Sequence, residues 1–132
     1  MALKLLILSI AIAICSVNTT ETPLKCWRCA SDAPNASFCD DPFDPSVLND
    51  QQKRWIYVEC SYPPSPYGQE RNPTIPVCKK AIQYVNGQKM VLRSCFWVDK
   101  DAPKDECLHT RTPSYIKTEF CETCTTDGCN SF

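Results

Sequence analysis

The chain has 132 residues, 22% of them charged, and a formal net charge of −1 at pH 7. Its lysines and arginines form no cluster and do not alternate with aromatic residues, which argues against nucleic acid as a partner. With 11 prolines and 3 glycines, the composition also argues against a long helix beyond the first residues.

The first residues predict a secretory signal peptide. Lys4 supplies one positive charge, and the apolar run over residues 5–14 is too short to span a bilayer. Small residues follow it, which fits cleavage after Cys15 or Ser16. We therefore expect residues 1–16 to be removed and the mature protein to be secreted.

Removal of the signal peptide leaves an even number of cysteines. Of the 11 cysteines in the chain, Cys15 is lost with the signal, so 11 − 1 = 10 remain. An even count at this density in a secreted chain predicts a disulfide framework. Five bridges at roughly 2–4 kcal/mol each would dominate the stability of a domain with few large apolar side chains. The ten are Cys26, Cys29, Cys39, Cys60, Cys78, Cys95, Cys107, Cys121, Cys124 and Cys129.

The first half of the mature chain alternates short strands with irregular segments. Residues 24–29 predict a short strand, and the proline-containing residues 30–50 predict turns. Residues 55–58, aromatic and β-branched, predict a further strand. The five prolines of residues 61–76 predict an extended, irregular connector.

The clearest local signal is a β-hairpin around Asn86-Gly87. Strands over residues 79–85 and 88–94 flank this dipeptide, which favours a type I′ turn. In that register Cys78 faces Cys95 at the base of the hairpin. The two cysteines could bond to each other, or each could bond to a different neighbouring strand, and periodicity alone leaves both possibilities open.

The remainder of the chain predicts a third loop and a small closing loop. A charged turn over residues 99–106 is followed by a loop between Cys107 and Cys121, with a return strand over residues 115–120. Asp-Gly at residues 127–128 is a turn signal, which places Cys124 and Cys129 at the two ends of a small loop.

No catalytic, metal or cofactor site is expected. The pairs Cys26/Cys29 and Cys121/Cys124 have the spacing of zinc half-sites, but they lie much too far apart along the chain for a zinc ribbon, and no βαβ pattern supports a redox role. His109 is the only histidine and no nucleophile motif accompanies it. The acidic pairs Asp40/Asp41 and Glu119/Glu122 are expected to be solvated surface groups.

Two further groups of residues are candidates for surface roles. Asn35 and Asn18 each begin an N-glycosylation sequon, and we favour Asn35 because Asn18 lies close to the expected cleavage point. Aromatic residues are numerous for a small domain: most should pack around the disulfides, and any that point outward would be interface anchors. They are Trp27, Trp55, Tyr57, Tyr84, Trp97 and Tyr115.

The cysteine motifs resemble a known family. Leu-Lys-Cys26-x-x-Cys29, Cys78-Lys-Lys, Arg-Ser-Cys95 and the terminal Cys124…Asp-Gly-Cys129-Asn130 resemble the three-finger domain of the urokinase-receptor/lymphocyte-antigen-six (uPAR/Ly-six) superfamily. The resemblance covers residues 24–130. Asp-Pro-Phe after Cys39, and Phe-Trp after Cys95, are similar to the insect branch that includes quiver/sleepless, boudin and crooked.

The resemblance implies a small, disulfide-rich, all-β three-finger fold. Finger one would span residues 30–59, finger two residues 79–94, and finger three residues 108–120. Asn130 would form hydrogen bonds within the disulfide hub. The implied bridges are Cys26–Cys78, Cys29–Cys39, Cys60–Cys95, Cys107–Cys121 and Cys124–Cys129.

The resemblance also bears on localisation. Most quiver-like members are held on the cell surface by a glycosylphosphatidylinositol (GPI) anchor, which requires a hydrophobic C-terminal tail. Only Asn130, Ser131 and Phe132 follow the last cysteine. We expect a secreted extracellular protein, or a GPI-anchored one if the C-terminus is truncated.

For function, the resemblance implies a non-enzymatic protein that binds and modulates a membrane receptor or ion channel, in the context of sleep or neuronal excitability. The alternatives are septate-junction assembly or trafficking in epithelia, and a secreted toxin. We expect the binding site at the tip of finger two, at Tyr84, Asn86, Gly87 and Lys89.

Overall fold

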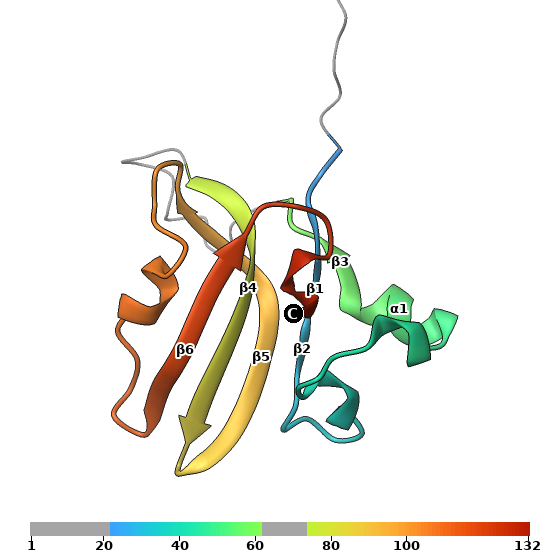
Figure 1. Cartoon of the computed structure of the whole chain (residues 1–132), viewed down its shortest axis with the longest axis horizontal. Coiled ribbons are helices and arrows are strands. Elements are labelled where there is room, and N and C mark those ends of the chain that lie inside the picture. The colour runs from blue at the N-terminus through green and yellow to red at the C-terminus, as the bar shows by residue number, and fades with distance from the viewer. Residues whose placement is uncertain (1–21, 62–73) are drawn as a thin grey trace, which may run out of the picture.

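The computed structural model describes residues 22–61 and 74–132. The predicted signal peptide, Asn18 and most of the proline-rich connector lie outside these ranges. The described chain is mostly β, as predicted. In it, β1 (Lys25–Trp27) pairs with β3 (Tyr57–Glu59). A larger sheet, which includes β2 (Cys29–Ala30) and β6 (Ile116–Cys124), has the order β2-β5-β4-β6 (Figure 1). None of its helices has the length and hydropathy needed to span a bilayer.

The predicted hairpin forms the centre of the larger sheet. β4 (Thr74–Val85) and β5 (Gln88–Asp99) pair in the predicted register, in which Cys78 faces Cys95. Asn86 and Gly87 have φ angles of 49° and 79°, as a type I′ turn requires. The strands extend beyond the predicted limits, so residues 74–76 belong to β4 and not to an irregular connector. Pro76 is tolerated because β6 pairs with β4 only from Cys78 onward.

The strand predicted over residues 55–58 is wrong in its first half. Asp50–Ile56 form helix α1, and only Tyr57–Glu59 form β3. A capping box begins the helix: the Asn49 side chain accepts from the Gln52 backbone N–H at 2.8 Å, and the Gln52 side chain accepts from the Asn49 N–H at 2.9 Å. This cap overrides the β propensity of the aromatic and β-branched residues that follow it.

Finger three differs from its prediction mainly in extent. Its return strand, β6, spans Ile116–Cys124, longer than the predicted residues 115–120. A short 3-10 helix, Glu106–His109, packs against β6 and brings Cys107 to Cys121. The backbone N–H of Thr123 donates to the carbonyl of Lys104 at 2.8 Å, which ties the preceding loop to the end of this strand.

The five disulfides pair as the family resemblance implied, with Cα–Cα distances of 5.3–6.1 Å. Cys78 and Cys95 share a face of the hairpin but bond outward, Cys78 to Cys26 and Cys95 to Cys60. This resolves the two possibilities left open by the hairpin register. The cross-links therefore join the base of finger two to β1 and to the residue that follows β3, and the finger tips project away from this hub.

Candidate functional site

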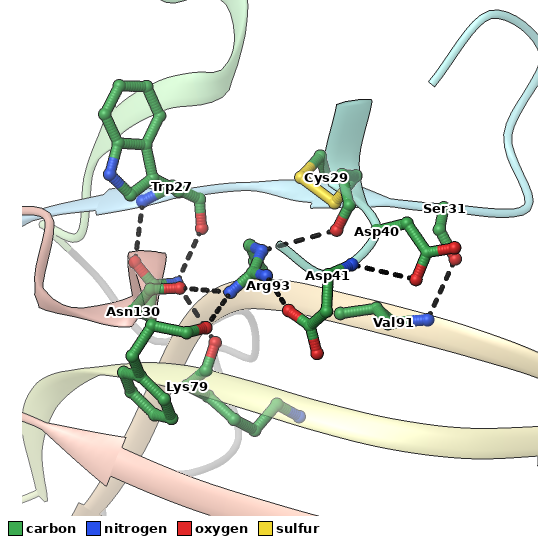
Figure 2. The surroundings of a disulfide bond; sticks show 11 residues. Trp27, Cys29, Ser31, Asp40, Asp41, Lys79, Val91, Arg93 and Asn130 are labelled. Atoms are coloured by element: carbon green, nitrogen blue, oxygen red, sulfur yellow. Dashed lines mark hydrogen bonds and ion pairs between the residues drawn. A yellow bond between two sulfur atoms is a disulfide. The ribbon is translucent and has the colours of Figure 1, made fainter. Parts of the chain in front are cut away.

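Asn130 is a polar cross-link inside the hub, in agreement with the role implied by the resemblance. Its side chain is fully buried. The side-chain oxygen accepts from the Trp27 backbone N–H at 3.1 Å, and the side-chain nitrogen donates to the carbonyls of Trp27 and Lys79 at 2.9 and 3.0 Å (Figure 2). One amide thus satisfies three backbone groups on two different strands, which fixes the position of β1 against β4.

A second polar cross-link, centred on Arg93, was not predicted from the sequence. Its guanidinium is fully buried, donates to the carbonyls of Asn130 and Phe132 at 2.6 and 3.0 Å, and pairs with Asp41 at 2.6 Å (Figure 2). The other carboxylate oxygen of Asp41 lies 2.9 Å from the Lys80 ammonium. Asp41 was expected to be only a solvated surface group; instead its partly exposed carboxylate is shared between two cations of the central sheet.

The charges in this cluster stabilise one another. Burial by itself raises the pKa of Asp41, but hydrogen bonds and charge from Lys80 and Arg93 outweigh it, so the pKa lies below its ordinary 3.8. Burial lowers the pKa of Arg93, and the negative charge of Asp41 opposes that effect. A guanidinium titrates so far above neutrality that Arg93 stays protonated. Asp41 and Arg93 are therefore both ionised at physiological pH.

Aromatic rings surround these cations and join finger one to the hub. The Phe43 ring lies 4.8 Å from the Arg93 guanidinium carbon, and the Phe132 ring lies 5.1 Å from the Lys80 ammonium. Phe43 also packs edge-on against Trp27, with ring centroids 5.3 Å apart. These contacts hold finger one against the central sheet.

The tips of fingers two and three form one continuous surface. β6 pairs with β4 up to Ile116, and the backbone N–H of Asn86 in the turn donates to the carbonyl of Tyr115 at 2.9 Å. The two tips line a shared open depression. We call this set the tip surface: Tyr84, Asn86, Gly87, Ser114, Tyr115 and Lys117, with Lys89 paired beside Tyr84.

The structure brings together all four residues predicted for the binding site. Tyr84 is half-buried, whereas Asn86, Gly87 and Lys89 are exposed at the turn. Sequence reasoning missed Ser114 and Lys117 because they come from finger three, and the β4–β6 register that places them beside finger two leaves no local signal. Tyr115 was noted only as one of several aromatics, and it is 55% exposed.

The other surface candidates are spread over the molecule. Trp55 is 66% exposed on α1 of finger one, whereas Trp27 is buried, and Tyr57 and Trp97 are half-buried. Asn35 is exposed in a turn with φ 59°, so the favoured sequon is accessible in the folded protein. Its use for glycosylation remains a prediction.

The groups considered for chemistry lie in structural settings. The sulfur atoms of Cys26, Cys60 and Cys95 lie within 4.8 Å of one another, but each is part of a disulfide and provides no thiolate for a metal. His109 is exposed, and its Nε2 lies 3.7 Å from the carboxylate of Asp105, the residue just before the same short helix. The arrangement best suits a rigid scaffold that presents a recognition surface.

Comparisons with known proteins agree with this architecture. The model of the Quiver family u-PAR/Ly-6-like domain matches residues 24–130. The chain is also 35% identical over 126 residues to the UPAR/Ly6 domain-containing protein crok of Drosophila melanogaster, a match that covers 92% of this chain and 76% of crok. No solved structure matched the chain.

Proposed function

Because the chain belongs to the Quiver family of u-PAR/Ly-6-like domains, we propose that it is a secreted or cell-surface, non-enzymatic binding protein that modulates a membrane receptor or ion channel. The observation that carries the proposal is the tip surface. It places two tyrosines, a turn and two lysines at the end of the molecule remote from the disulfide hub.

The tip surface has the physical character of a protein-binding site. Tyrosine supplies a large contact area with little conformational entropy to lose, and it is enriched among the residues that dominate binding energies. The Asn86 hydrogen bond and the β4–β6 ladder fix the backbone beneath Tyr84 and Tyr115. The surface is therefore ordered before a partner arrives, which reduces the entropic cost of association.

A binding assay on live cells tests the proposal. Fluorescently labelled mature protein would be titrated onto cells of the tissue that expresses the gene, and bound label would be measured by flow cytometry. Replacing both tyrosines, Tyr84→Ala with Tyr115→Ala, should weaken binding by about 30-fold, the effect of losing about 2 kcal/mol at an interface hot spot. Asn86 and Gly87 are left unchanged because both need positive φ.

The control is Trp55→Ala, which removes an exposed aromatic ring from finger one. The proposal predicts unchanged binding for this control. If Trp55→Ala abolishes binding and the tyrosine variant does not, the tip surface is the wrong site.

The cell type that is bound separates the contexts implied by the family resemblance. Binding to neurons would support modulation of a receptor or channel that affects excitability or sleep. Accumulation at epithelial cell contacts would favour septate-junction assembly or trafficking instead. Transcripts restricted to a venom or salivary gland would favour a toxin.

A further inference from the structure

A row of two cations and one aromatic ring crosses the finger tips. Tyr84 on β4 lies directly opposite Lys89 on β5 and directly opposite Lys117 on β6. Directly paired residues project from the same face of a sheet, with Cβ atoms about 5 Å apart. Tyr84 is therefore flanked on one face by two exposed ammonium groups.

The groups that line the shared depression are mainly hydrogen-bond donors. Tyr84, Ser114 and Tyr115 have hydroxyl groups, Asn86 has a side-chain amide, and Lys117 has an ammonium group. No carboxylate lines this depression within the described chain. The two tyrosine rings add an apolar wall. The combination suits an anionic group attached to a short aliphatic stem.

The positive charge of the row is not neutralised by its neighbours. Among residues 22–61 and 74–132, no carboxylate lies within 4.0 Å of the Lys89 or Lys117 ammonium. Asp32 lines an adjoining depression together with Lys89, and Glu119 lies two residues from Lys117 where the β4–β6 register shifts. Asp32 and Glu119 lie at the margin of the tip surface, and neither forms an ion pair with Lys89 or Lys117.

We infer that the tip surface binds an acidic loop of a partner protein, with an aspartate or glutamate side chain placed between Lys117 and the tyrosine hydroxyls and a second one against Lys89. This inference rests on the proposed function, since it names the chemistry of the partner at the same surface. A sulfated polysaccharide fits less well because it requires an extended basic patch, whereas this patch has two cations in a chain of net charge −1.

An NMR titration with a defined probe tests the inference. The probe is a blocked hexapeptide of alternating aspartate and glutamate, and its neutral counterpart carries asparagine and glutamine. In the isotope-labelled protein, the acidic peptide should cause saturable shifts of the amides of Tyr84, Lys89, Tyr115 and Lys117. High salt should weaken the effect, and the neutral peptide should not reproduce it.

Variants locate the charge requirement. Lys117→Gln and Lys89→Gln should each weaken peptide binding by about two- to fivefold, the range for exposed ion pairs. Lys100→Gln, at an exposed lysine in the turn after β5, is the matched control and should leave binding unchanged.

Three results would overturn the inference: shifts centred on another surface, equal binding of the neutral peptide, or tighter binding of a heparin hexasaccharide at the same residues. The cell-binding assay distinguishes failure of this inference from failure of the proposed function. If the tyrosine variant loses cell binding but the acidic peptide does not bind, the tip surface remains the binding site and only the acidic chemistry of the partner is wrong.

Discussion

The most informative perturbation of the scaffold is Asp41→Asn. It keeps the shape of the side chain and an oxygen that accepts a hydrogen bond, and it removes the negative charge between Arg93 and Lys80. Arg93 is fully buried and the Lys80 side chain is 9% exposed, so neither cation regains full hydration. The amide nitrogen of the variant would also face a cation. The substitution therefore removes the charge of Asp41 and one of the two oxygens that accept from Lys80 and Arg93.

The expected loss follows from the burial of the cluster. Breaking a fully buried pair costs roughly 3–5 kcal/mol because a charge is left without a partner. The Asp41 side chain is 29% exposed, so water screens part of this interaction, and we expect a loss of about 2 kcal/mol in the free energy of unfolding. Asp40→Asn is the matched control: the Asp40 side chain accepts from the Asp41 N–H at 2.9 Å, and an asparagine oxygen can do the same.

The assay is urea unfolding with the disulfides intact, followed by tryptophan fluorescence, since Trp27 packs against Phe43 beside the cluster. The pH dependence gives an independent check. Because the folded-state pKa of Asp41 lies below 3.8, the stability from its charge is present above that value and is lost as the pH falls through the folded-state pKa. The variant should lack this acid-dependent component. A loss below about 0.5 kcal/mol, similar to Asp40→Asn, would refute the reasoning.

Three further predictions follow from the hub, the bridges and the surface. Asn130→Ala should destabilise the fold by about 2–4 kcal/mol in urea unfolding, because three buried backbone groups lose their partner; a loss near zero would mean that water replaces the amide. Replacing Cys107 and Cys121 by alanine should cost about 3 kcal/mol and replacing Cys26 and Cys78 about 4 kcal/mol, since the bridges close loops of 14 and 52 residues; the opposite order of urea midpoints would contradict this. An N-glycosidase should lower the mass of the protein, and Asn35→Gln should abolish that decrease. An unchanged decrease in the variant would assign the glycan to another site.

Local sequence signals predicted the central hairpin because its information is local. Asn86-Gly87 specifies the turn, and the turn then fixes every pairing of β4 with β5. The error at Trp55 arose because one local signal was used without another. The prediction rested on the aromatic and β-branched run at residues 55–58 and left out the capping residues Asn49 and Gln52, which mark the start of the helix at Asp50. The capping box was visible in the sequence and would have indicated the helix.

The polar clusters could not be predicted from local signals. Asp41, Lys80 and Arg93 come from three separate segments, and only the tertiary fold brings them within hydrogen-bond distance. Adjacent carboxylates such as Asp40-Asp41 are usually on the surface. This context therefore favoured a solvated group over an ion pair with Lys80 and Arg93. The finger-three half of the tip surface is non-local for the same reason, because Lys117 reaches Tyr84 only through β4–β6 pairing.

Disulfide mapping of the purified protein tests the covalent hub most directly. Protein purified without reductant would be alkylated, digested and analysed by mass spectrometry for linked peptides. The structure predicts five links, Cys26–Cys78, Cys29–Cys39, Cys60–Cys95, Cys107–Cys121 and Cys124–Cys129, with none of these cysteines alkylated. Alkylated cysteines within this set, or a link between Cys78 and Cys95, would contradict the account.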